Sequence, residues 1–219
     1  TVLDTSMGWG DRLAGFFASD ATHYIGCDPN PNTFKVYWEM VREFDNLAPG
    51  KTVQLHRCGA EDLPWDMIKD VDCAFTSPPY FSTEEYNKGG EFEEDQSWAK
   101  FNEYDKWRDE FYLPVALNSF NSLSDNGFLL TNIMDPKVKG VRHRSGDELV
   151  DSLREHWLGQ VGMRIMQRPQ GKNVFKTHEE LEAFMNKIYI ENVWCFGKNK
   201  DFDFFRHKRR ATLEGLFGE

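Results

Sequence analysis

Short apolar runs alternate with amphipathic segments along the first third of the chain. The runs at residues 2–4, 23–28, 52–57 and 71–76 have the length of buried strands, and each ends in a polar residue. Residues 11–19 and 32–44, which lie between these runs, carry apolar positions at helical spacing. This alternation predicts a parallel sheet with helices on both faces, because each parallel connection needs a crossover segment.

The rest of the chain extends the pattern to seven strands. The remaining predicted elements are a helix over 98–123 with a bend near Pro114, a turn at 125–127, a strand over 128–133, helices over 146–157 and 177–185, and strands over 162–167 and 188–196. No full crossover helix joins the last two strands, which predicts an antiparallel pair at one edge. The expected fold class is therefore α/β: a doubly wound, mostly parallel seven-stranded sheet with an antiparallel edge strand.

Length and the absence of repeats indicate a single domain. A chain of 219 residues can build one sizeable core, and no boundary divides residues 1–219. The strand-like residues Val2 and Leu3 follow Thr1 directly, without Met or a lead-in. We therefore expect that an upstream segment is missing.

The segment from Asp4 to Gly10 links the first strand to the first helix. Gly8 and Gly10 permit positive φ and let the backbone approach a ligand closely. Strand, glycine loop and helix in this order are typical of nucleotide-binding folds. An ordinary βα loop has the same outline, and two spaced glycines do not separate these alternatives.

Acidic residues follow the second and third predicted strands. Asp28 lies about 20 residues beyond the glycine loop, where a carboxylate suits the two hydroxyls of a ribose. It could instead cap the turn into the next helix. The segment Ala60-Glu61-Asp62 ends the third strand and could read an adenine edge, or be a solvated loop.

The fourth strand ends at a stiff corner, Thr76-Ser77-Pro78-Pro79-Tyr80. Neither proline can donate to a sheet, so the strand cannot continue and the corner's carbonyls lack sheet partners. The corner therefore presents a hydroxyl, free carbonyls and an aromatic ring. A plain Pro-Pro turn with a half-buried tyrosine is the alternative.

Two charged segments lie near these strand ends. Residues 84–95 carry a net charge of −5, which fits either a mobile lid or a solvated insertion. After the fifth strand come four cations without an acid, Lys137, Lys139, Arg142 and Arg144. This loop emerges on the same rim as Ser77, so it is either a phosphate-binding element or a solvated basic loop.

Composition narrows the classes of protein. There is no apolar run of about 18 residues, which argues against a membrane span. The four cysteines form no CxxC pair, so we expect no metal site, and free thiols in a reducing, cytoplasmic compartment. The net charge of −10 argues mildly against broad affinity for nucleic acid.

Taken together, these motifs resemble those of class I S-adenosylmethionine-dependent methyltransferases over nearly the whole chain. The segment from Leu3 to Gly10 is similar to the family's first motif, in which Asp4, Ser6, Gly8 and Gly10 would surround the cofactor's methionine part. By the same resemblance Asp28 would hold the ribose, and Ala60, Glu61 and Asp62 would touch the adenine. The implied cofactor is S-adenosyl-L-methionine.

The corner resembles the fourth motif of the DNA amino-methyltransferases, which act on the exocyclic amine of cytosine or adenine. The resemblance implies that the catalytic residues are Ser77, Pro78, Pro79 and Tyr80. Ser77 and the Pro78 carbonyl would accept hydrogen bonds from the amine, and Tyr80 would stack on the base. It implies a nucleic-acid partner, DNA rather than RNA. A serine in first place is most similar to the cytosine enzymes.

Alternative substrates stay open at this stage. The first motif precedes the fourth here, unlike in many cytosine enzymes with the serine form, and no long insertion offers a dedicated DNA-recognition domain. RNA, a protein glutamine amide or a small molecule are alternative substrates, and a non-catalytic cofactor-binding subunit is a further alternative. The sequence does not indicate an oligomeric state.

Overall fold

The computed structural model describes residues 1–166, 175–185 and 188–201. Its main sheet has seven strands: β1 (Val2–Asp4), β2 (His23–Cys27), β3 (Thr52–His56), β4 (Val71–Thr76), β5 (Leu123–Asn132), β8 (Trp157–Met166) and β9 (Ile188–Gly197). Their order is β3-β2-β1-β4-β5-β9-β8. The first five strands are parallel, and β9 is antiparallel to β5 and to β8. The predicted fold class is confirmed, with β9 one position inside the edge.

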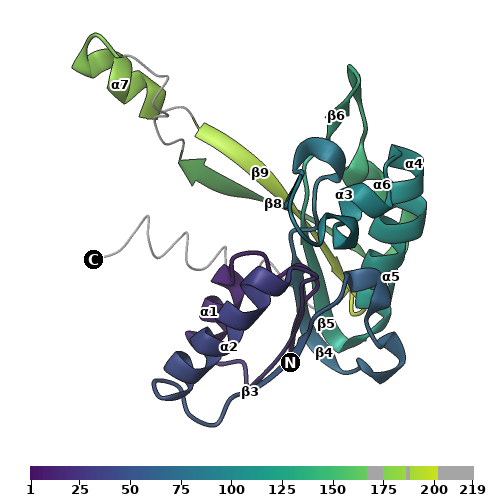
Figure 1. Cartoon of the computed structure of the whole chain (residues 1–219). Helices are drawn as coiled ribbons and strands as arrows, with labels where there is room; N and C mark the ends of the chain where they lie inside the picture. The colour runs from purple at the N-terminus through teal and green to yellow at the C-terminus, as the bar shows by residue number, and fades with distance from the viewer. Residues whose placement is uncertain (167–174, 186–187, 202–219) are drawn as a thin grey trace, which may run out of the picture.

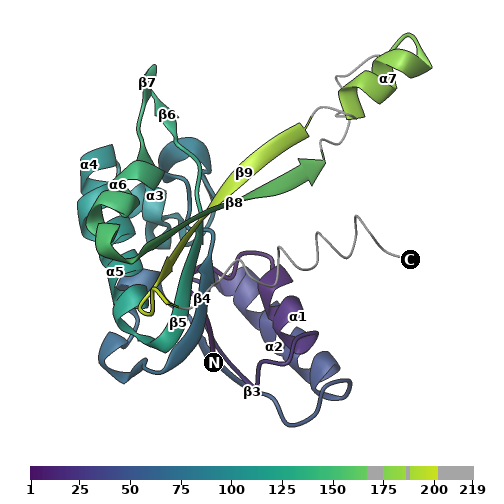
Figure 2. The ribbon, with the colours of Figure 1, turned by 180° about the vertical axis from the view of Figure 1, so that it is seen from behind.

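Helices cover both faces of the sheet, as Figures 1 and 2 show from opposite sides. On one face lie α1 (Asp11–Phe17) and α2 (Pro31–Asp45). The other face carries α3 (Ser97–Lys100), α4 (Tyr104–Trp107), a π-helix (Arg108–Tyr112), α5 (Leu113–Asn121) and α6 (Ser145–Ser152). Short 3₁₀ turns occur at Ala60–Asp62, Trp65–Met67, Phe81–Thr83, Glu93–Asp95 and Arg154–His156.

Each helical layer has its own apolar core. Under α1 and α2 the core includes Leu13, Phe16 and Tyr37. The larger core on the opposite face contains Leu129, Trp107 and many other aromatic side chains. Because the sheet is covered on both sides, its polar groups meet solvent mainly at the strand ends, and the carboxyl ends of β1 to β5 form one rim.

The predicted helix over 98–123 is broken into several pieces. After α3, Phe101 leaves the helical region of backbone space, and the chain restarts at α4. A π-helix then runs up to Leu113, and Pro114 lies in the first turn of α5. The backbone is helical through Tyr112 and Leu113, so Pro114 lies inside a continuous helical stretch, directly after its π-helical part.

The predicted turn at 125–127 lies within β5, which begins earlier than expected. Val71 pairs with Leu123, but the next pair is Cys73 with Phe128. The extra residues between Leu123 and Phe128 form a bulge in the strand. Residues 125–127 therefore depart from regular strand geometry as a bulge, and β5 continues on both sides of them.

Two antiparallel ribbons project from the body (Figure 1). One is a short hairpin of β6 (Lys137–Val138) and β7 (Val141–Arg142), where the sequence predicted a loop. The other is formed by the outer parts of β8 and β9, with α7 (His178–Met185) beyond it. Among the described helices, none is long and apolar enough to cross a membrane.

Candidate functional site

A cleft of about 370 Å³ lies at the carboxyl ends of β1, β2, β3 and β4. This size lies within the range of small-molecule sites, roughly 300–1,000 Å³. Most of the predicted cofactor residues line it, together with the serine and one proline of the corner: Ser6, Gly8, Asp28, Ala60, Glu61, Ser77 and Pro79. Four separate strand ends thus contribute to one site, as expected for a doubly wound sheet.

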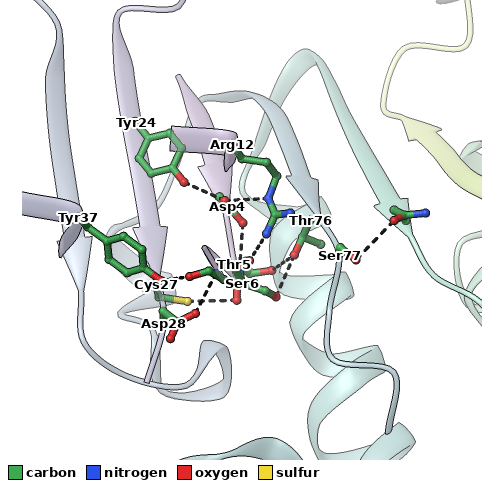
Figure 3. A network of polar contacts seen from close by, with 12 residues as sticks. Asp4, Thr5, Ser6, Arg12, Tyr24, Cys27, Asp28, Tyr37, Thr76 and Ser77 are labelled. Atoms are coloured by element: carbon green, nitrogen blue, oxygen red, sulfur yellow. Dashed lines mark hydrogen bonds and ion pairs between the residues drawn. The ribbon is translucent and has the colours of Figure 1, made fainter. Parts of the chain in front are cut away.

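Asp4 organises the glycine loop from below and does not line the cleft. Its side chain is fully buried and accepts hydrogen bonds from the Tyr24 hydroxyl (2.8 Å), Arg12 Nε (2.8 Å) and the Ser6 backbone N–H (3.1 Å; Figure 3). Arg12 also donates to the Ser6 carbonyl. A direct cofactor contact was expected for Asp4. The structure instead has both carboxylate oxygens occupied by the protein, so Asp4 acts through the loop that it holds.

The buried Asp4 carboxylate raises the pKa values of the two side chains that donate to it. Burial alone would lower the pKa of Arg12, but the adjacent Asp4 carboxylate outweighs that effect and raises it. Burial and the same carboxylate raise the pKa of Tyr24, so its hydroxyl stays protonated and donates. Arg12 and Tyr24 thus both donate to Asp4, and Arg12 also donates to the loop backbone, which fixes the entry into the glycine loop.

Asp28 ties the second strand end to the glycine loop. Its carboxylate accepts from the backbone N–H of Gly8 (3.0 Å) and of Asn30 (3.0 Å), one bond at each oxygen. The Tyr37 hydroxyl also lies within hydrogen-bonding reach of this carboxylate, so about one acceptor site remains for a ligand hydroxyl. Burial raises the pKa of Asp28, and the two backbone hydrogen bonds only partly offset that rise.

The two glycines of the loop have different tasks. Gly8 (φ 56°) lines the cleft, and its carbonyl accepts a hydrogen bond from the Tyr37 hydroxyl. Gly10 (φ 86°) precedes α1 and does not line the cleft. A side chain at Gly10 would approach Met40 Sδ to 2.9 Å, so its role is structural.

The third strand end contributes Ala60 and Glu61. Glu61 Oε1 accepts from Lys100 Nζ at 2.8 Å, while Oε2 is buried and has no partner among the described residues. Asp62 lies outside this cleft and lines a smaller neighbouring pocket, where Lys100 is 3.6 Å away. The predicted adenine contact at Asp62 thus has no place in the main cleft.

The corner at the end of β4 is held by a residue that the sequence did not single out. Asn132, at the end of β5, accepts from the Tyr80 hydroxyl (3.1 Å) and from Ser77 Oγ (3.4 Å), and its amide donates to the Asn192 carbonyl (3.1 Å). Its position at the carboxyl end of a strand next to β4 was the available signal.

Tyr80 is turned into the protein. Its ring is 7% exposed, belongs to the larger core and does not line the cleft. Its hydroxyl lies 3.2 Å from Ser77 Oγ. The predicted stacking of Tyr80 on a base is therefore not available in this structure, because packing and the bond to Asn132 hold the ring inside. The exposed aromatic rings on the cleft wall belong instead to Trp9 and Tyr86.

A pair of hydroxyl bonds joins the corner to the glycine loop. Thr5 Oγ1 donates to Thr76 Oγ1 at 2.9 Å, and Ser6 Oγ lies 3.1 Å from the same atom (Figure 3). Thr76 directly precedes Ser77, so these bonds fix the distance between the loop and the serine hydroxyl.

The acidic segment forms another wall of the cleft. Glu84, Tyr86, Asn87 and Asp95 line it, as do the two residues that follow, Gln96 and Ser97. Gln96 Nε2 and Ser97 Oγ are buried without a partner among the described residues. Buried polar atoms without a partner are uncommon in folded proteins, so these two are candidates for contact with a ligand.

The predicted phosphate-binding residues lie outside the cleft, on the β6–β7 hairpin. Lys137, Lys139, Arg142 and Arg144 are all exposed, and none lines the cleft. Metal ligands are also lacking: no three His, Cys, Asp or Glu side chains of the described residues lie close enough to hold an ion.

Comparisons with known proteins agree with this fold. No protein-family model matches the chain, and no curated protein matches it by sequence. The methyltransferase subunit of a type I restriction-modification system from Streptococcus thermophilus aligns with a TM-score of 0.56 at 18% identity, over 91% of this chain and 40% of its own. A candidate methyltransferase from Thermoplasma acidophilum aligns with a TM-score of 0.50 at 10% identity, over 92% and 69%. The chain thus has the fold of solved methyltransferases.

Proposed function

We propose that the protein is an S-adenosylmethionine-dependent methyltransferase that acts on an exocyclic amine of a nucleobase, with DNA favoured over RNA. The observation that carries this proposal is the position of the Ser77 hydroxyl. Ser77 lines the same cleft as the glycine loop and Asp28, and the Thr5–Thr76 bond links the loop to the strand end that carries this serine.

The residues of the cleft fit the proposed cofactor. Asp28 has a free acceptor site for a ribose hydroxyl. Glu61 Oε2 can accept from an adenine amine, and Gln96 Nε2 can donate to a carboxylate or a ring nitrogen; both atoms are otherwise unpaired among the described residues. Gly8 leaves the loop backbone accessible on the same wall. When bound, S-adenosylmethionine supplies an activated methyl group on a sulfonium.

The protein's main task is then to orient the amine. A nucleobase amine is a poor nucleophile because its lone pair is delocalised into the ring. Hydrogen bonds from its N–H groups to Ser77 Oγ and to the Pro78 carbonyl would favour a pyramidal nitrogen whose lone pair points away from the ring. Asn132 supports this role, since a Ser77 hydroxyl that donates to Asn132 keeps its lone pairs free to accept from the amine.

The experiment is methyl transfer from labelled S-adenosylmethionine to unmethylated DNA and RNA, followed by nucleoside mass spectrometry. Ser77→Ala should lower the rate by about 10²-fold if the hydroxyl accepts in the transition state. Ser152→Ala is the matched control, because that exposed serine bonds only to its own helix.

Two results would contradict the proposal. Transfer that Ser77→Ala leaves unchanged would remove the assigned mechanism. Binding of the cofactor without transfer to DNA or RNA would favour a protein amide or a small-molecule substrate, or a non-catalytic subunit.

A further inference from the structure

The β6–β7 hairpin concentrates positive charge beside the proposed site. Lys137, Lys139 and Arg142 are exposed, and no carboxylate of the described residues forms an ion pair with them. Arg144 lies 3.6 Å from Asp147, and both of these side chains are largely exposed. Most of the hairpin's charge is thus free to meet an anionic partner.

The base of the hairpin is fixed to the corner through stacked aromatic rings. The His143 ring stacks on Tyr104 with 3.7 Å between centroids, and its backbone N–H donates to the Pro136 carbonyl at 3.0 Å. Tyr104 meets Phe81 edge-on at 5.7 Å, and Phe81 directly follows Tyr80. The hairpin is therefore held rigidly next to the segment that carries Ser77.

The tip of the hairpin presents an apolar side chain to solvent. Lys139 (φ 48°) and Gly140 (φ 85°) form a two-residue turn with both φ angles positive, which suits the twist of a tight hairpin. Val138 packs against the larger core, while its partner across the hairpin, Val141, is 59% exposed. Two extended residues carry the tip about 7 Å beyond the base.

We propose that this hairpin engages double-stranded DNA and that Val141 inserts into the base stack where the target base leaves it. The inference rests on the proposed function. Ser77 lies in a cleft, and an amine inside a duplex cannot reach it unless its nucleotide is extruded. Extrusion opens a gap of about two base spacings of 3.4 Å each, which an apolar side chain can fill.

Charge complementarity supports this orientation of the duplex. Phosphates are attracted to Lys139 in the turn and to Arg142, which follows Val141 along β7. The cleft wall formed by Glu84 and Asp95 repels them. The backbone is therefore held on the hairpin side, and the extruded base enters the cleft alone.

The test compares methyl transfer to native and to heat-denatured unmethylated genomic DNA. Val141→Ala should lower transfer to native DNA at least about 10-fold and transfer to denatured DNA less than about 2-fold, because single strands need no extrusion. Val141→Leu should retain transfer to both forms. Val36→Ala, at a similarly exposed valine on α2, should change neither.

A second pair of substitutions separates insertion from phosphate binding. Lys139→Gln with Arg142→Gln should weaken binding to both DNA forms and reduce the salt dependence of binding by about two phosphate contacts. If Val141→Ala lowers methyl transfer equally on native and on denatured DNA, or on neither, the proposed insertion of Val141 is overturned. The proposed function would stay intact. If the unmodified protein transfers no methyl group to either form of DNA, the proposed function is contradicted, and so is the insertion of Val141 that rests on it.

Discussion

The side-chain oxygen of Asn132 lies 3.1 Å from the Tyr80 hydroxyl and 3.4 Å from Ser77 Oγ. One amide thus orients both hydroxyls of the corner from the neighbouring strand. We expect Asn132→Leu to lower kcat roughly 10- to 100-fold, because misplacing a reacting group by about 1 Å has effects of this size. Tyr80→Phe removes one of the two bonds and should have a smaller effect.

Steady-state kinetics measure kcat in the Asn132→Leu and Tyr80→Phe variants, and a separate titration measures their affinity for the cofactor product. The Kd for S-adenosylhomocysteine should stay within about 2-fold in both variants, since neither residue lines the cleft. Tyr112→Phe is a suitable control, because its buried hydroxyl bonds to the Ser145 carbonyl away from the site. Equal losses in kcat and in cofactor affinity would mean that Asn132 supports the whole cleft rather than the corner.

The ion pair of Asp4 and Arg12 should contribute strongly to stability. Asp4→Ala leaves the guanidinium and the Tyr24 hydroxyl without their buried partner, and we expect the free energy of unfolding to fall by about 3–5 kcal/mol. Urea unfolding measures this change. Asp66→Ala, at an exposed aspartate, should change stability by no more than about 0.5 kcal/mol. A small loss in Asp4→Ala would show that water can replace the network.

The raised pKa of Asp28 predicts opposite effects of pH on binding and on stability. If Asp28 binds the ribose as proposed, its carboxylate form is the acceptor, so affinity for S-adenosylhomocysteine should fall as pH drops through the raised pKa. Asp28 favours its protonated form in the folded state, so its contribution to stability is present below the unfolded pKa and is lost as pH rises through the folded one.

Calorimetric titrations between about pH 4 and 7 test the binding part, with Asp28→Asn as the reference. That variant should bind about 10- to 100-fold more weakly at pH 7, as expected for loss of charged hydrogen bonds, and should lose the pH dependence. Persistence of the same pH profile in Asp28→Asn would assign it to another group.

Trp9 should contribute to ligand binding without contributing to stability. Its side chain is 80% exposed and lines the cleft. Stacking of a base on an aromatic ring contributes about 1–3 kcal/mol, so Trp9→Ala should raise KM for DNA or Kd for the cofactor roughly 5- to 150-fold. A rise in KM for DNA alone would show that Trp9 stacks on a base of the DNA, and a rise in Kd for the cofactor alone would show that it stacks on the cofactor's adenine. If neither value changes, Trp9 contacts neither ligand.

Local patterns were sufficient to predict most of the sheet. The first four strands and the helices between them follow from apolar periodicity and from the glycine and proline positions. The break in the helix at Phe101 was not predicted; in the structure Phe101 is buried in the larger core and stacks on Phe111, an arrangement that apolar periodicity does not reveal. The bulge in β5 was missed because Asp125 to Gly127 has true turn chemistry, and only pairing with β4 reveals that the strand continues.

The site was predicted in part for a similar reason. Strand-end residues such as Asp28 and Ser77 were found because the topology collects them. Asp4 was assigned to the cleft because sequence gives the position of a residue but not the direction of its side chain. Gln96 has no local signal that distinguishes it from other polar residues, and Asn132 has only its position at the end of β5. Their contacts become apparent only when burial and partners are known.

The late position of β9 in the chain has a consequence for folding. Thr131 of β5 pairs with Trp194 of β9, so the sheet closes through a contact between distant segments. Contacts of this kind form slowly, because the intervening chain must first be ordered. Until β9 docks, the edge of β5 and the end that carries Asn132 are exposed, and Asn132 lacks the Asn192 carbonyl that fixes its amide. The order at the corner after β4 is thus acquired only when the last strand of the sheet has been made.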